Sequence, residues 1–384
     1  MRRMKKRHGN VLVLGGPYMQ NFYSCITRSA MKRNWYLEVD ERYNPPRDWR
    51  GDGVFSMHLD VPVMNGFLDD VLARGIPVVD LIDVTGRTDF GSVATDETAL
   101  ANVAARHFRE RNFRHAAFFA MEWTPLHQRR YDAFATAFGE PRPEKWSWPD
   151  ESQGDTDRRA LAEWTARKLK TAPKPVAVLT FNAYNASFLL SVCNNHRMAV
   201  PQEAAILAGM DNAIYTQHRE HPISGIEHDI ELICDKAADL LQRMMDGRCA
   251  HNVSIRVPPR GIAVRSSTDA LAVADPVLRK ALIHATHNIS RPFGPTQLAE
   301  RTGVTLARLN QIAERELGRS MLDEIIRLRI EEAKRLMKET DGKLASIARL
   351  AGFCNASYFC KTFLDRTGIT PHTWRTRIKK QLNA

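Results

Sequence analysis

The stretch Ile347 to Trp374, IARLAGFCNASYFCKTFLDRTGITPHTW, decides the fold of the C-terminal part of this 384-residue chain. It predicts a short helix, a tight turn at glycine and a longer second helix. The stretch Leu298 to Gly318, LAERTGVTLARLNQIAERELG, repeats the pattern, with Gly303 matching Gly352 at an offset of 49 residues and the second halves matching at 50. Each copy therefore predicts helix-turn-helix geometry, in which the second helix is presented to the major groove of DNA.

The segment between the two copies predicts one long helix. From Ser320 to Thr340, apolar residues recur at helical intervals: Leu322, Ile325, Ile326, Leu328, Ala333, Leu336 and Met337. A helix of this length can join two small bundles. Two DNA-recognition helices, called readers below, that are joined by one long helix can reach two successive segments of the major groove on one face of DNA.

Core and surface positions can be assigned within the opening stretch. The residues expected in the core of a small three-helix unit are Ile347, Ala348, Phe353, Tyr358, Phe359 and Phe363. The residues expected on the exposed side of its second helix are Asn355, Ala356, Ser357, Cys360 and Lys361. Thr370 and Pro371 then begin a final helix, with Trp374 packed inward and Arg375, Arg377, Lys379 and Lys380 either facing phosphates or forming a solvated surface.

The charge of the chain is concentrated near its C-terminus. The formal net charge is +11, with 55 Lys and Arg against 44 Asp and Glu. Residues 276–384 hold 20 of the basic and 10 of the acidic residues, which leaves the first 275 residues nearly neutral. This asymmetry indicates a C-terminal module that meets a polyanion, although a solvated basic face is the alternative.

The long N-terminal part alternates strand and helix signals. Apolar runs typical of buried strands occupy residues 11–16, 52–58, 76–82, 115–121, 175–182 and 204–212, with helical patterns such as 97–112 and 186–197 between them. Such alternation predicts parallel sheets covered by helices on both faces. Ligands bind such sheets beyond the carboxyl ends of strands, where this sequence places Asn182 and the Gly209 to Asn212 turn.

Signatures of catalysis, cofactors and metals are missing from the sequence. The Gly15-Gly16 turn fits neither a dinucleotide loop nor a phosphate loop, and there is no GxSxG motif. The six cysteines form no CxxC pair or zinc spacing, so reduced thiols are expected, with no metal and no cofactor. No run approaches the roughly 20 apolar residues of a membrane span and no signal-peptide core follows the basic start, which predicts a cytoplasmic binding protein that is not an enzyme.

The paired motif resembles the double helix-turn-helix domain of AraC/XylS-type transcription activators over about the last 110 residues. The second copy matches closely, whereas the first lacks the usual Arg and Phe between Thr305 and Ala313. By position in the motif, the resemblance implies the following DNA-binding residues: Arg308, Asn310 and Gln311 in the first reader, and Ser357 and Lys361 in the second. Asn355 is also expected to bind DNA, because it lies on the exposed side of the second helix.

Residues 10 to 265 resemble LacI/GalR-type effector domains and sugar-binding proteins of the periplasmic type I fold. The resemblance implies two lobes with a ligand between them, and a division into a sensor domain, residues 1–268, and a DNA-binding domain, residues 269–384. Matched motif by motif, Asp211, Asn182 and Arg130 fall where the family binds sugar hydroxyls, and His228 takes a place often held by Gln. As alternatives, Asp211 and Asn182 cap turns and Arg130 is a surface cation.

Together these resemblances imply a sugar-responsive transcription regulator. The expected partners are operator half-sites in DNA, a pentose effector, a second copy of the chain and RNA polymerase, but no membrane. The expected role is activation of genes of pentose catabolism, with the sugar favouring one arrangement of the lobes. Two alternatives remain open: a sugar-processing enzyme fused to a DNA-binding module, and a ligand-independent regulator whose sensor is vestigial.

Overall fold

The computed structural model divides the chain into two compact units, Met1–Ala270 and Leu271–Ala384. The residues that it describes are 9–16, 19–42, 44–57, 62–148, 157–217, 221–250, 252–270, 272–273, 275–340 and 342–382. The sequence analysis places the division after residue 268. Among the described residues, no helix is both long enough and apolar enough to span a bilayer.

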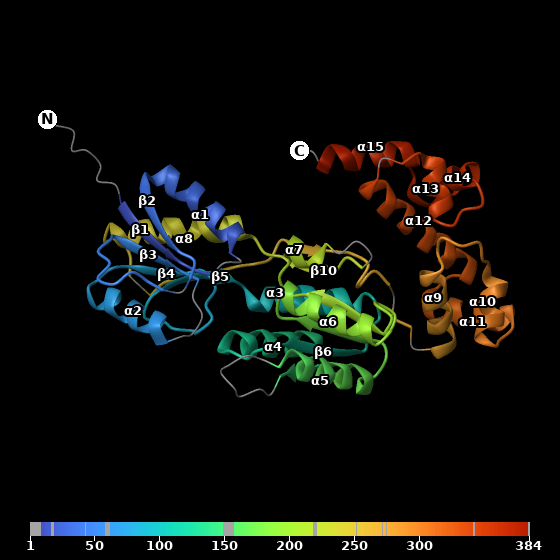
Figure 1. Ribbon diagram of the computed structural model, residues 1–384, viewed down its shortest axis with the longest axis horizontal. Helices are drawn as coiled ribbons and strands as arrows, with labels where there is room; N and C mark the ends of the chain where they lie inside the picture. Colours follow the sequence, from blue (N-terminus) through green and yellow to red (C-terminus); the bar gives the residue numbers. More distant parts are fainter. Residues whose placement is uncertain are drawn as a thin grey trace. The chain divides into compact units, whose positions relative to one another are not determined.

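The first unit contains two six-stranded sheets, which form two lobes (Figure 1). The sheet of the first lobe has the order β11-β5-β4-β3-β1-β2, and all its neighbouring strands are parallel. Its strands are β1 (Gly9–Leu14), β2 (Trp35–Asp40), β3 (Gly53–Ser56), β4 (Val78–Asp80), β5 (Gly91–Thr95) and β11 (Ser254–Val257). Val11 and Val13 pack toward α1 (Gln20–Arg33) and α8 (Ile230–Met245), whereas Leu12 and Leu14 pack toward α2 (Pro62–Ala73), as the alternation of a strand requires.

The sheet of the second lobe has the order β12-β10-β9-β8-β6-β7, and its only antiparallel pair among the described strands is β10 with β12. Its strands are β6 (His115–Ala120), β7 (Glu144–Ser147), β8 (Val176–Thr180), β9 (Ala204–Ala208), β10 (Ser224–Glu227) and β12 (Gly261–Ala263). Its helices are α3 (Glu97–Arg109), α4 (Pro125–Phe138), α5 (Arg158–Thr171), α6 (Ala183–Asn195) and α7 (Ala213–Thr216). Ala117 and Phe119 of β6 pack in the core that contains α5 and α6, and Phe118 packs on Tyr131 of α4.

The chain passes between the lobes three times, after β5, after β10 and after β11. Hydrogen bonds tie these crossing segments together. The backbone N–H of Asp96 donates to the carbonyl of Val257, and the N–H of Arg260 donates to the carbonyl of Glu227. The Thr95 hydroxyl and His228 Nδ1 lie 2.7 Å apart and join the first crossing to the second. The lobes therefore meet at a bonded junction, where hinge motion is expected to concentrate.

The α/β fold of the first unit agrees with the sequence analysis, and each apolar run predicted as a strand contains one. The helical patterns at 97–112 and 186–197 correspond to α3 and α6. The sequence analysis missed β2, β5, β7, β10, β11 and β12. Four of these six, β2, β7, β11 and β12, are edge strands, where a strand needs less apolar sequence because one side of it is not covered.

The second unit is helical and holds the two predicted helix-turn-helix motifs. Its helices are α9 (Pro276–His287), α10 (Pro295–Thr302), α11 (Leu306–Leu317), α12 (Met321–Glu339), α13 (Leu344–Leu350), α14 (Ala356–Thr367) and α15 (Pro371–Leu382). One core gathers α9 to α11 with the start of α12, and a second gathers the rest of α12 with α13 to α15. Figure 1 shows α12 running from one helix cluster to the other, as the sequence predicts.

The two helix bundles also touch beside α12. Gly303 and Gly352 both have positive φ, 74° and 81°, as their turns require. A Cβ at Gly303 would meet nothing within 4 Å, whereas one at Gly352 would lie 2.0 Å from the carbonyl oxygen of Ile289, which follows α9. Gly352 therefore serves both the turn and the close approach of the two bundles.

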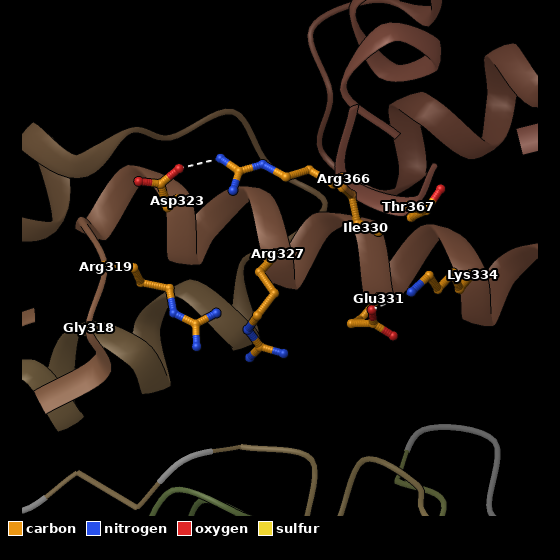
Figure 2. Close-up of a pocket in the computed structure, with 9 residues that line it drawn as sticks. All are labelled: Gly318, Arg319, Asp323, Arg327, Ile330, Glu331, Lys334, Arg366 and Thr367. Carbon is orange, nitrogen blue, oxygen red and sulfur yellow. Dashed lines mark hydrogen bonds and ion pairs between the residues drawn. The ribbon is translucent and has the colours of Figure 1, made fainter. Parts of the chain in front are cut away.

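Figure 2 shows a second link between the bundles, an ion pair from Arg366 in α14 to Asp323 in α12. The pair borders a cavity of about 470 Å³ that is also lined by Arg319, Arg327 and Lys334. Glu324 binds Arg327, and Glu331 binds Lys334. Arg319 also pairs with Glu324, so each of the three cations has an acidic partner.

The predicted core of the second motif is confirmed except at one residue. Ile347, Ala348, Phe353, Phe359 and Phe363 are buried, and Trp374 packs on Phe363 with ring centroids 6.2 Å apart. The prediction for Tyr358 is wrong, because 42% of this residue is exposed. Its ring packs on Phe353 only at an edge, with centroids 6.1 Å apart, since it lies on the side of α14 that faces away from the core.

Candidate functional site

The four predicted effector residues lie at the ends of strands or on a helix of the second lobe. Asn182 follows β8, Asp211 follows β9 and His228 follows β10, whereas Arg130 belongs to α4. Their neighbours show what each side chain can still offer to a ligand.

Arg130 is a buried cation with a dedicated partner. Only 4% of the residue is exposed, and its Nε and Nη2 donate to the two carboxylate oxygens of Glu97 at 2.5 and 2.8 Å. Its Nη1 donates to the carbonyl of Phe181 at 2.7 Å, and the guanidinium lies 4.5 Å from the centre of the Phe181 ring. The alternative that Arg130 is a surface cation is therefore wrong.

His228 lies beside Arg130 at the junction of the lobes. Its Nε2 donates to the carbonyl of Gly209 at 2.8 Å, which leaves Nδ1 to accept from the Thr95 hydroxyl at 2.7 Å. Burial, with a further contribution from the positive charge of Arg130, lowers the pKa of His228 to about 4. The imidazole is thus neutral near pH 7, and it ties the end of β9 to the crossing segment after β5.

Asp211 and Asn182 each have a structural role. The carboxylate of Asp211 accepts from both terminal nitrogens of Arg265, at 3.0 and 2.7 Å, and from the hydroxyl of Thr216 at 2.6 Å. Asn182 is the N-cap of α6, and its side-chain oxygen accepts from the N–H of Asn185 at 2.9 Å. The capping alternative for Asn182 is therefore correct, and contact of either residue with a ligand stays a prediction.

The sequence analysis missed His127, which precedes Arg130 by one helical turn. Its Nδ1 accepts from the N–H of Thr124 at 3.2 Å, so Nε2 carries the proton, and burial lowers the pKa to about 3. The ring centroid lies 3.7 Å from that of Phe181. Among the described residues Nε2 has no hydrogen-bond partner. The only sequence signal was the Thr124-x-x-His127 spacing of a capping box, which by itself indicates a helix start.

The junction thus brings together Arg130, Glu97, Phe181, His127 and His228 at the carboxyl ends of the strands. Hydrogen-bonding groups beside an aromatic ring are typical of sites that bind polar organic ligands. Across the part of the chain that the structure describes, no group of three or more His, Cys, Asp or Glu is placed to hold a metal ion. The cysteines at 25, 193, 234, 249, 354 and 360 are free thiols.

The candidate DNA interface consists of the exposed sides of α11 and α14. Arg308, Gln311, Ser357 and Lys361 are exposed, and Arg308 Nη1 donates to Gln311 Oε1 at 2.7 Å. Asn355 is exposed and is the N-cap of α14, where its side-chain oxygen accepts from the N–H of Tyr358 at 2.8 Å.

Asn310 differs from the expectation. It is half-buried, and its side-chain oxygen accepts from the N–H of Met321 at 3.1 Å, at the start of α12. Asn310 occupies the side of α11 that faces the next helix, because it lies three positions before the fully buried Ala313 and residues three apart share one face of a helix. Its amide oxygen stabilises a helix start, so the expectation of an exposed base-side residue is not met.

The basic tail offers fewer free cations than its composition suggests. Arg375 donates to the carbonyl of Gly342 at 2.8 Å, which fixes α15 to the segment before α13. Arg377 is exposed. The side chains of Lys379 and Lys380 lie outside the described part of the chain, and their contact with phosphates stays a prediction.

Comparisons with known proteins agree with this architecture. Residues 105–268 match the periplasmic binding protein-like domain and residues 298–377 match the helix-turn-helix domain. The chain therefore joins a periplasmic binding protein-like domain to a helix-turn-helix domain. The chain is similar to bacterial xylose operon regulatory proteins.

The similarity to these regulators extends over most of the chain. The xylose operon regulatory protein of Escherichia coli is 23% identical over 377 residues, covering 90% of each chain. That of Haemophilus influenzae is 25% identical over 301 residues, covering 74% of this chain and 75% of the relative. The structure of the xylose-binding transcription activator xylR has the same fold, with a TM-score of 0.76, 20% identity, and coverage of 97% of this chain and 99% of the other.

Proposed function

We propose that this chain is a sugar-responsive, sequence-specific DNA-binding transcription regulator that activates genes of pentose catabolism and acts in the cytoplasm with RNA polymerase. The observation that carries the proposal is the union, in one chain, of a two-lobed α/β sensor and a duplicated helix-turn-helix unit. The relatives named for the xylose operon support a pentose as the effector.

The proposed sugar site lies at the junction of the lobes. Neutral His228 and the Arg130–Glu97 pair form its polar base, Phe181 offers a ring face to the apolar side of a sugar, and Asn182 and Asp211 accept from its hydroxyls. Arg130 positions Glu97 and Phe181, and its guanidinium nitrogens are bound to these two residues rather than free for the ligand. A sugar that contacts both lobes favours their closed arrangement, which changes the affinity for DNA through its different affinity for the two states.

The full-length protein tests this proposal with D-xylose, L-arabinose and D-glucose. We expect D-xylose to raise the melting temperature and to change the affinity for a DNA fragment selected by the protein from a random pool. Turnover of the sugar would favour the fused-enzyme alternative. Equal DNA affinity with and without every sugar would favour the vestigial-sensor alternative.

The variant Asp211→Ala tests the site residue, with Asp229→Ala as the control, because Asp229 is half-buried near the same junction and also pairs with an arginine, Arg260. We expect Asp211→Ala to lose the sugar-induced shift and also to lower the melting temperature of the unliganded protein, because Arg265 loses its partner. Retention of the full sugar-induced shift in Asp211→Ala would remove Asp211 from the site.

We also propose that the regulator is a homodimer that associates through the edge of the first lobe. The edge strand β2 exposes Tyr36 and Val39, and the adjacent α1 exposes Met31, with 68%, 46% and 76% of these residues accessible. Exposed apolar residues on an open strand edge favour association with a second chain.

We expect Tyr36→Glu to sediment as a monomer. The control variant Val63→Glu, at an exposed apolar position on α2, should sediment as the parent does. A dimeric Tyr36→Glu variant would contradict this interface.

A further inference from the structure

The two reader helices, α11 and α14, can be aligned residue by residue from their N-caps. Thr305 caps α11 by accepting from the N–H of Arg308, and Asn355 caps α14 by accepting from the N–H of Tyr358. A constant offset of 50 residues follows from this match. Under it, the buried residues coincide, with Leu309 matching Phe359 and Ala313 matching Phe363.

The same offset matches the exposed positions of the first two turns. Ala307 corresponds to Ser357, Arg308 to Tyr358 and Gln311 to Lys361, and all six residues are exposed. Arg308 and Tyr358 therefore occupy equivalent positions, three residues after the cap, on the side of each reader that carries the candidate DNA contacts. The sequence analysis assigned Tyr358 to the core, so this equivalence depends on the structure.

The two side chains offer different chemistry at this shared position. Arg308 presents a guanidinium that Gln311 orients through a hydrogen bond of 2.7 Å. An oriented guanidinium suits the O6 and N7 acceptors of guanine. Tyr358 presents an aromatic ring that is held at one edge by Phe353, which leaves much of its surface exposed. An apolar ring surface suits the methyl group of thymine, which is the apolar group that this base exposes in the major groove.

We propose that Tyr358 contacts the operator directly. It reads a thymine in the DNA element bound by α14, at the position where Arg308 reads a guanine in the element bound by α11. Tyr358 is then a specificity-determining residue, and the two DNA elements differ at this base pair although the two motifs are repeats. This inference rests on the proposed DNA-binding function, and it adds the base class that each reader distinguishes.

The test uses the full-length protein with D-xylose present, and DNA selected by the parent protein from a random pool. We expect the selected sites to contain two related elements that differ by guanine against thymine at one equivalent position. Replacing that thymidine with deoxyuridine removes only the methyl group, and we expect this change to weaken binding by the parent about fivefold, toward the low end of the effect of a single mismatch. The loss should be absent in Tyr358→Ala.

Variants separate DNA contact from folding. We expect Tyr358→Ala to lose about 5- to 30-fold in affinity and to relax the preference for thymine, whereas Tyr358→Phe keeps both because the ring remains. Leu364→Ala is the matched control, since Leu364 lies on the same helix and is also 42% exposed but corresponds to Glu314, farther from the cap. Arg308→Tyr should change the preferred base of the first element from guanine to thymine.

Two results would overturn the proposal: selected elements that are identical at the equivalent position, or parent binding that is equal with thymidine and deoxyuridine. The deoxyuridine comparison needs no variant, so it decides the question even if Tyr358→Ala fails to fold. Failure of the parent protein to enrich any DNA sequence would instead contradict the DNA-binding function itself.

Discussion

Replacing Arg130 with alanine is expected to destabilise the sensor unit by about 3–5 kcal/mol, as the loss of one partner from a buried ion pair does. The guanidinium is buried and binds both carboxylate oxygens of Glu97 and the carbonyl of Phe181. Its removal leaves the Glu97 carboxylate in a poorly hydrated position without a counter-charge. The free energy of unfolding in denaturant, followed by the fluorescence of sensor tryptophans, measures the effect.

Arg260→Ala is the matched control for this prediction. Arg260 also binds two carboxylates, those of Asp229 and Glu231, but it is half-exposed, so its loss should change stability by less than about 1 kcal/mol. The double variant Arg130→Met with Glu97→Leu should recover much of the loss, because it leaves no charge unpaired. Equal effects of Arg130→Ala and Arg260→Ala would mean that Arg130 is not buried in solution.

Replacing Phe363 with alanine is expected to destabilise the DNA-binding unit by about 3–5 kcal/mol, as large-to-small changes in a core do. Phe363 is fully buried, and its ring packs on Phe359 and Trp374, with centroids 5.6 and 6.2 Å away. The second bundle is small, so the void cannot be filled by rearrangement of many neighbours. Operator binding should be lost because the second reader unfolds.

Thermal melts of the full-length chain can separate this effect from the sensor, because the two units have separate cores. We expect Phe363→Ala to lower the transition of the DNA-binding unit while that of the sensor stays in place. Leu364→Ala, one residue further along α14 and exposed, should change stability by about 0.5 kcal/mol at most. A Phe363→Ala variant that keeps both the operator affinity and the melting temperature of the parent would contradict the assigned core.

Local sequence patterns predicted the readers well because their structure depends on near neighbours. Gly352 and Gly303 marked the turns, and the apolar period marked the buried faces of α11, α12 and α14. The error at Tyr358 has the same origin. Aromatic character marked it as core, but the period of the helix places it one position before the buried Phe359, on the other side of α14.

By itself, the sequence determined the two classes of domain, their order along the chain, the helix-turn-helix duplication and six of the strands, β1, β3, β4, β6, β8 and β9. Each of these depends on residue period or on turn chemistry within a short segment. Only the tertiary structure decided the partners of the candidate site residues. Arg130 pairs with Glu97, which lies 33 residues away in the sequence, and Asp211 pairs with Arg265, which lies 54 residues away. Strand order brings these distant segments to the same edge of a sheet. No local pattern records such a partner, so a charged residue at a strand end looks the same in sequence whether it is free for a ligand or already paired.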